Sequence, residues 1–276
     1  MTATVNVTTV GDPTLNLGLT YNSYNADGSR TTVDTVMGYG WTHSYNIFLF
    51  SQLGAMFRFD GDGRITRYAI AQGGGFSAAT GYFETLVRNT DGSFTLTKKD
   101  KTIYTFTSVS GTHFLVNGPV WPLTKIVDRN GNTTTLTYTG GNLTAVTDTY
   151  GRTVALGYNA ENHVTSVTDP LGRVTTFQYD STGHLLTQIT DPNGKSIQYT
   201  YNVLFQITSK TDKAGRVFNY IYANYLPIAV YDSTGTGPAT LSNPNNWATD
   251  PTQLAMFQLR VYIPSTTSNT DGRGNV

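Results

Sequence analysis

The chain reads TSVTDPLGRVTTFQYDSTGHLLTQI over residues 165–189, and this is the clearest of five copies of one pattern between residues 124 and 223. Each copy has an aspartate, a glycine three residues later and a tyrosine ten residues later, with successive aspartates 20 to 22 residues apart. The aspartates are Asp128, Asp148, Asp169, Asp191 and Asp212. The glycines are Gly131, Gly151, Gly172, Gly194 and Gly215. The tyrosines are Tyr138, Tyr158, Tyr179, Tyr201 and Tyr222. A fixed period of this length is the signature of a repeat architecture.

The spacing within one copy predicts a β-hairpin. Aspartate at the first position and glycine at the fourth, with proline at the second in two copies, fit a type I turn followed by a residue with positive φ. Apolar residues then alternate with polar ones, as in Val154, Leu156 and Tyr158, which is the period of a strand with one buried face. A second turn returns the chain; in one copy Asn162 is expected to take the left-handed conformation there. Each repeat is therefore predicted to be one hairpin of an antiparallel meander.

The repeat tyrosines and aspartates have competing interpretations. Exposed tyrosines in a column could stack on sugars, but their phase with Phe177 and Tyr199 favours the buried face, where aromatic pairs contribute up to about 1 kcal/mol each. The evenly spaced aspartates could form a carboxylate ladder, but Asp in an Asp-x-x-Gly turn accepts bonds from its own backbone. We interpret both sets as structural residues of the repeat.

Composition excludes several classes of protein. Among 276 residues, 18 Lys and Arg balance 18 Asp and Glu, so no overall basic charge attracts nucleic acid or an anionic membrane. There is no cysteine, which excludes disulfides, thiolate nucleophiles and cysteine-bound metals. The N-terminal MTATVNVTTVGDP lacks the features of a secretory signal peptide, and no apolar run approaches the roughly 20 residues that span a bilayer.

The period divides the chain into three parts. Residues 1–120 are predicted to be a β-rich capping region, residues 121–235 a β-hairpin array, and residues 236–276 an insertion followed by the start of a further repeat. Within the last part, residues 253–260 could form a short helix, or residues 256–263 a strand. Because the motif returns at Asp271 and the sequence stops before its strand, we expect the natural polypeptide to continue with more repeats.

For the other candidate site residues, the sequence context favours a role in packing or in a turn. Asp60 and Asp62 resemble the start of a calcium loop, but its twelfth position is Ala71, so a turn is preferred. The histidines are scattered; His163 and His184 occupy the same repeat position, which favours a surface or packing role. His43, between Trp41 and Tyr45, is the one histidine that we consider as a catalytic candidate, and a packing role is preferred for it.

Basic residues follow four of the turn glycines, and they could form a basic row along one rim or a solvated edge that discourages aggregation. These residues are Arg152, Arg173, Lys195 and Arg216. We predict no catalytic, cofactor-binding or metal-binding residue, and no cofactor.

These repeats resemble the YD repeat of Rhs and teneurin-type proteins, whose consensus is close to xxTDxxGRxxxFxYDxxGxLTxI. The segments Leu17–Ser23 and Gly38–Tyr45 are similar to the region that precedes the repeats in bacterial Rhs proteins. The resemblance covers about residues 15–223 and the final six. It implies an all-β fold in which a long antiparallel sheet of hairpins, preceded by an N-terminal β-domain, spirals into a partial β-shell. In bacteria such shells enclose a C-terminal toxin, whereas a related teneurin barrel serves adhesion. The chain has too few repeats to close a full shell, and it lacks the C-terminal core segment and any toxin.

Three functional hypotheses remain. The leading one is a non-enzymatic structural segment of a bacterial Rhs shell that helps to encapsulate a C-terminal toxin or effector. Its partners are then the rest of the parent polypeptide and its cargo, and the resemblance implies a secreted or cell-surface location. The alternative is an adhesion module that recognises glycans or a protein receptor. An all-β carbohydrate-active enzyme is the weakest hypothesis, because it needs a carboxylate pair and the only glutamates are Glu84 and Glu161. Nucleic acid and membrane insertion are not expected.

Overall fold

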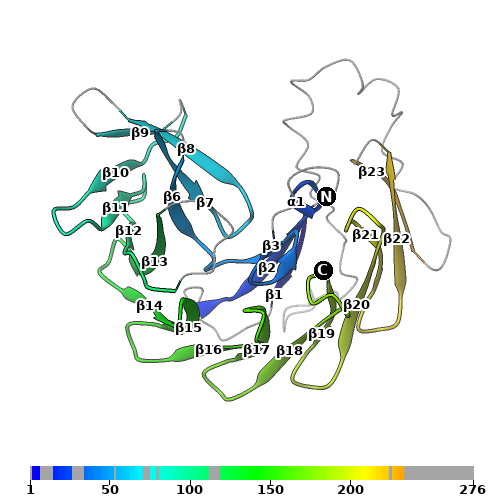
Figure 1. The fold of residues 1–276 in the computed structure, drawn as a ribbon. Helices are drawn as coiled ribbons and strands as arrows, with labels where there is room; N and C mark the ends of the chain where they lie inside the picture. The colour runs from blue at the N-terminus through cyan, green and yellow to red at the C-terminus, as the bar shows by residue number, and fades with distance from the viewer. Residues whose placement is uncertain are drawn as a thin grey trace, which may run out of the picture.

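The described chain is all-β, as the sequence predicts. The computed structural model (Figure 1) describes residues 2–6, 15–26, 34–52, 54–70, 75–78, 81–111, 119–223 and 226–232. These residues form strands β1 to β23 and one short helix, α1 (Ser23–Ala26). No helix within these ranges has the length and apolar character needed to cross a bilayer. The alternatives for residues 253–263 and the motif at Asp271 lie outside the described residues.

Two small sheets come from the N-terminal part of the chain. Strands β1 (Thr2–Asn6), β2 (Gly18–Asn22) and β5 (Trp41–His43) form an antiparallel sheet in that spatial order. Strands β3 (Asp34–Thr35) and β4 (Gly38–Tyr39) form a separate two-stranded hairpin. We call residues 15–26 and 34–46 the N-terminal segment.

Strands β6 to β13 close into a ring of eight in the described part of the chain. They are β6 (Phe48–Gln52), β7 (Ala55–Phe59), β8 (Ile65–Ile70), β9 (Phe76–Ala78), β10 (Thr85–Arg88), β11 (Phe94–Thr97), β12 (Ile103–Phe106) and β13 (Val120–Val127). A barrel of about eight strands is just wide enough for side chains to fill its interior. Large side chains such as Tyr68, Leu86 and Phe94 are accordingly almost fully buried.

Strand β13 belongs to both the barrel and the repeats. Its first residues pair with β6, in the register Val120 with Phe50 and Pro122 with Phe48. Its last residues, from Lys125 to Val127, pair with β14. The repeat sheet therefore continues directly from one strand of the barrel.

The repeats form one continuous antiparallel sheet beyond β13. Its strands are β14 (Thr133–Thr139), β15 (Asn142–Thr147), β16 (Thr153–Tyr158), β17 (Val164–Thr168), β18 (Val174–Tyr179), β19 (Leu186–Thr190), β20 (Ser196–Tyr201), β21 (Ile207–Thr211), β22 (Val217–Ala223) and β23 (Leu226–Asp232). The register shifts immediately before every repeat tyrosine, for example between Gly157 and Tyr158. Such bulges bend a strand and increase its twist, which gives a physical cause for the curvature of the sheet in Figure 1.

The apolar face of the repeat sheet is its concave face. Side chains such as Leu156, Phe177 and Ile189 are buried there, whereas alternate residues such as Thr176 and Gln198 are exposed on the other face. Burying each large apolar side chain contributes about 1.5–3 kcal/mol to the stability of the fold. A segment that covers this face is therefore stabilised by the apolar area that it buries.

The N-terminal segment packs against the concave face of the repeat sheet. Figure 1 shows β1 to β3 and α1 inside the arc of the repeat sheet. The Trp41 indole Nε1 donates to the hydroxyl of Tyr201 at 2.9 Å. The Tyr21 hydroxyl donates to the carbonyl of Phe205 at 3.3 Å and accepts from the backbone N–H of Ile207 at 3.1 Å. Because Trp41 and Tyr21 are fully buried, these bonds are shielded from water.

Candidate functional site

The β3–β4 hairpin is fixed against two successive repeats by backbone hydrogen bonds. The N–H of Val164 donates to the carbonyl of Val36 at 2.8 Å, and the N–H of Tyr39 donates to the carbonyl of His184 at 2.9 Å. Gly38, between them, has φ +84°, and a Cβ at this position would lie 2.3 Å from the His184 carbonyl oxygen. Only glycine allows so close an approach of the hairpin backbone to the repeat.

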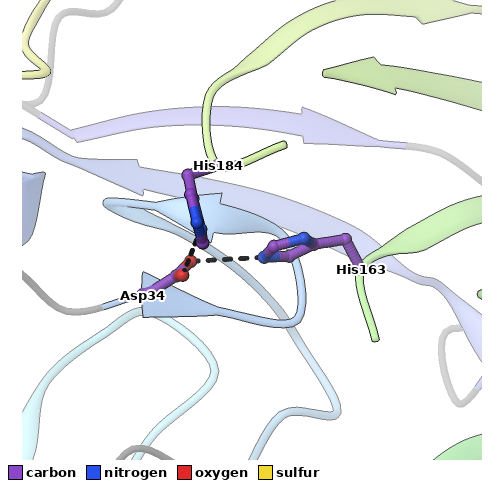
Figure 2. A group of neighbouring side chains, drawn as sticks. All are labelled: Asp34, His163 and His184. Atoms are coloured by element: carbon purple, nitrogen blue, oxygen red, sulfur yellow. Dashed lines mark hydrogen bonds and ion pairs between the residues drawn. The ribbon is translucent and has the colours of Figure 1, made fainter. Parts of the chain in front are cut away.

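This docking places a carboxylate between two imidazoles (Figure 2). Asp34 Oδ1 lies 3.3 Å from His163 Nε2, and Asp34 Oδ2 lies 2.6 Å from His184 Nδ1. The ligand atoms of the three residues all lie within 4.8 Å of one another. We call these three residues the Asp-His-His cluster. Asp34 comes from the hairpin, and the histidines come from equivalent turns in two neighbouring repeats.

Aromatic rings orient both histidines. The His163 ring lies 5.1 Å from the Tyr179 ring, and its side chain is only 5% exposed. Its Nδ1 has no hydrogen-bond partner within the described residues. The His184 ring stacks on Tyr39 at 5.1 Å with an interplanar angle of 14°, and its side chain is 39% exposed. The cluster is therefore closed on the His163 side and open to solvent on the His184 side.

Burial and two nearby carboxylates act on Tyr39. Removal from water, together with the negative charges of Asp34 and Asp180, raises the pKa of the Tyr39 hydroxyl above its ordinary value. Tyr39 therefore stays a neutral phenol beside the cluster at physiological pH. Chemically, the cluster offers two imidazole nitrogens and a carboxylate, a donor set suited to first-row transition metals.

The five repeat aspartates lie in the hairpin turns. The Oδ1 atom of each accepts from the backbone N–H groups two and four residues later, at 2.8 to 3.0 Å. The five repeat glycines have φ between 76° and 87°. In the second turn, Asn162 has φ 64°, as predicted. Hydrogen bonding to the Lys213 ammonium lowers the pKa of Asp191.

The basic residues after the turn glycines do not form a row of unpaired charges. Three arginines each donate Nε to the aspartate of their own turn at 2.6 to 2.7 Å. The pairs are Arg152 with Asp148, Arg173 with Asp169 and Arg216 with Asp212. In the fourth turn, Asp191 pairs instead with Lys213 of the next turn, at 2.7 Å. Most of the positive charge on this rim is therefore neutralised locally.

The repeat tyrosines belong to the core, and each hydroxyl donates to the backbone carbonyl fifteen residues earlier at 2.5 to 3.0 Å. The acceptors are the carbonyls of Leu123, Leu143, Val164, Leu186 and Ile207. Each tyrosine thereby joins its strand to the preceding one, and we call these bonds the tyrosine ladder. The ladder does not present an exposed aromatic surface to sugars.

The remaining candidates are structural in their contacts. His43 is buried, accepts a bond at Nδ1 from the Tyr45 N–H at 3.2 Å, and has its pKa lowered to about 3 by burial. It also lines a small pocket with the repeat residues Tyr138 and Tyr158. Asp60 pairs with Arg58 at 2.7 Å, and Asp62 accepts from the Arg64 N–H at 3.0 Å, which is turn geometry.

The Asp-His-His cluster is the feature that sequence reasoning missed. The shared repeat position of His163 and His184 favours a surface or packing role, and it is the one signal from which their proximity could have been found. Nothing in the pattern indicates Asp34, which lies 129 residues before His163 and on a different sheet. His113 lies outside the described residues.

Two family models match parts of the chain. The model described as RHS Repeat matches residues 158–195 and 184–217, and a Domain of unknown function (DUF6531) matches residues 2–68. Comparison with curated proteins gave no match.

Several solved structures are similar to the chain at low identity. One is the N-terminal domain of effector protein SpvB from Salmonella typhimurium strain LT2, with 11% identity, a TM-score of 0.40, and coverage of 83% of this chain and 98% of that chain. Another is the Photorhabdus luminescens Tc holotoxin pore, with 11% identity, a TM-score of 0.34, and coverage of 78% and 15%. A third is TcdB2-TccC3, with 10% identity, a TM-score of 0.36, and coverage of 82% and 15%. The chain spans about 15% of the length of the two Tc toxin chains.

Proposed function

The chain carries RHS repeats, and from this premise we propose that it is a structural segment of an Rhs-type β-sheet shell. In the full polypeptide this shell would enclose a C-terminal toxin or effector, at a secreted or cell-surface location. The partners of the chain are then further repeats of the same polypeptide and the enclosed cargo. The proposal assigns no catalytic role to the chain.

The observation that carries the proposal is the tyrosine ladder. The same hydroxyl-to-carbonyl bond, over the same fifteen residues, recurs in all five repeats. A bulge of the same kind precedes each tyrosine. Each added repeat therefore extends the sheet and bends it without a new kind of interaction. Such a unit builds a curved wall.

The use of the polar groups in the repeats supports a non-enzymatic role. The repeat aspartates are occupied by backbone N–H groups and by basic side chains of the turns. The repeat tyrosine hydroxyls are occupied by backbone carbonyls. Groups committed in this way hold the sheet together and are not free to exchange protons with a substrate.

Protease protection of the natural polypeptide tests the proposal. The region downstream of the repeats should resist limited proteolysis in the wild type. It should be cleaved rapidly when Tyr158→Ala and Tyr179→Ala together break the ladder. Tyr150→Ala is the matched control, because Tyr150 is 75% exposed. Cleavage of the downstream region at the same rate in the wild type and the double variant would overturn the proposal, as would electron micrographs without a closed wall.

An adhesion role is the second candidate, favoured by exposed aromatic residues between β9 and β10. Phe83 is 71% exposed and Tyr82 is 40% exposed. Such rings can bind the apolar faces of sugars or a partner protein. A glycan array probed with the intact chain and with Phe83→Ser tests this role. Binding that is lost in the variant would favour adhesion, and no binding by either protein would remove this candidate.

A further inference from the structure

We propose that the Asp-His-His cluster binds one divalent transition-metal ion, with Zn²⁺ as the representative, and that this ion fastens the β3–β4 hairpin to two successive repeats. The inference goes beyond the shell function and is independent of it, because metal binding can be measured on the isolated chain. It rests on the positions of Asp34, His163 and His184 and on the side chains that surround them.

One pair of donor atoms already has the spacing of a tetrahedral zinc site. Zinc–nitrogen and zinc–oxygen bonds of about 2.0–2.2 Å place two ligand atoms of one tetrahedron roughly 3.3–3.6 Å apart. His163 Nε2 and Asp34 Oδ1 are 3.3 Å apart. His184 Nδ1 and Asp34 Oδ2 are 2.6 Å apart, a hydrogen-bond distance that is shorter than the tetrahedral spacing. Zinc would take the place of this hydrogen bond, with His184 bound through Nδ1 as a neutral imidazole whose ring proton lies on Nε2.

Little rearrangement separates the cluster from a metal site. The donors already lie within 4.8 Å of one another. His184 must move by less than about 1 Å to reach a tetrahedral spacing from Asp34, and its 39% exposed side chain has room to do so. His163 is buried against Tyr179, and the hairpin that carries Asp34 is held by backbone bonds on both sides. Two ligands are thus fixed, and the third can adjust.

The ligand types decide the class of metal. Calcium and magnesium prefer oxygen ligands throughout, whereas imidazole suits zinc and its first-row neighbours. The open side at His184 leaves the fourth position to water. His163 Nδ1 has no acceptor among the described residues, so affinity should be about 10–100-fold weaker than at a site where this second-nitrogen bond is made.

Calorimetric titration of the intact, untagged and chelator-treated chain with ZnCl₂ tests the proposal. The wild type should bind one equivalent, and Asp34→Asn or His184→Gln should weaken binding at least tenfold. Asp62→Asn is the matched control because Asp62 serves only its own turn, and it should bind as the wild type does. Saturating Zn²⁺ should raise the thermal midpoint of the wild type by roughly 5 °C, whereas Ca²⁺ and Mg²⁺ should not.

A measurement on the wild type guards against variants that fold poorly. Nitrogen-15 spectra of the histidine side chains should show His163 Nε2 and His184 Nδ1 shifting together as Zn²⁺ is added, while His43 stays unchanged. Absence of saturable binding by the wild type would overturn the proposal. Equal binding by Asp34→Asn and the wild type, or shifts confined to other histidines, would overturn it as well.

Discussion

Replacement of Tyr201 by phenylalanine removes a single hydroxyl that serves two partners. This hydroxyl donates to the Leu186 carbonyl at 2.5 Å and accepts from the Trp41 indole N–H at 2.9 Å. Loss of the ladder bond alone should cost about 1 kcal/mol. The fully buried indole N–H of Trp41 is also left without its acceptor, which adds about 1–3 kcal/mol. We therefore expect Tyr201→Phe to lower the free energy of unfolding by about 2–4 kcal/mol.

Tyr158→Phe is the matched comparison. The Tyr158 hydroxyl donates to the Leu143 carbonyl at 2.8 Å, within the same kind of ladder bond. The expected cost of this variant is about 1 kcal/mol. Equilibrium unfolding in urea, followed by circular dichroism, measures both free energies, and the m-value shows whether the unfolding reaction is unchanged.

The difference in unfolding free energy between Tyr201→Phe and Tyr158→Phe measures the contribution of the Trp41 indole bond. Costs for Tyr201→Phe and Tyr158→Phe that agree within about 0.5 kcal/mol, the usual scatter between independent sites, would refute a stabilising role for the indole bond. A double-mutant cycle with Trp41→Phe gives the same energy directly. We expect a coupling of at least about 1 kcal/mol between Trp41 and Tyr201, and a coupling near zero would contradict the docking of the N-terminal segment described above.

Substitutions at Gly38, with Gly172 as its comparison, and at His43 test local features. Gly38→Ala should cost more than about 2 kcal/mol, because φ +84° is unfavourable for alanine and the new Cβ would meet a carbonyl oxygen. Gly172→Ala should cost only about 1–2 kcal/mol, since φ is again positive but nothing lies within 4 Å; equal urea midpoints would refute the close approach at Gly38. His43 has a folded pKa of about 3 against 6.5 when exposed, so the unfolded chain binds the extra proton and stability falls as pH decreases from 6.5 towards 3. His43→Gln should reduce this slope by up to about 1.4 kcal/mol per pH unit, and an unchanged slope between pH 6 and pH 4 would refute the neutral buried imidazole.

Features encoded by neighbouring residues could be predicted from the sequence. Asn162 has positive φ as expected, because the conformation of a tight turn depends on the few residues within it. The all-β fold class followed in the same way from the alternation around Phe177. The bulge opposite each tyrosine was not predicted, although the return strand carries a trace of it: its buried residues, such as Leu186 and Ile189, lie three positions apart and not two. Ring closure between β13 and β6 also carried no signal, since the strands before residue 120 lack the period of the repeats.

The candidate site was not predicted, for a related reason. The common repeat position of His163 and His184 places them on one edge. Their partner Asp34 depends on where an aperiodic segment docks, and that depends on shape complementarity across more than a hundred residues of chain. Tyr21 illustrates the same difficulty, because its hydroxyl bonds to Ile207, 186 residues away. The period of the repeats predicts how neighbouring hairpins pair. It carries no information on which segment of the chain packs against their concave face.

The unequal reach of these contacts has a consequence for folding during synthesis. A ladder bond spans fifteen residues, so each hairpin can complete its hydrogen bonds soon after it leaves the ribosome, and short-range contacts form quickly. The partners of Tyr21 and Trp41 emerge between 160 and 186 residues later. Until then these aromatic side chains lack their native cover, and such nascent chains are prone to aggregation. The interval between the synthesis of Tyr21 and that of Ile207 is therefore the stage at which this region is most exposed to aggregation.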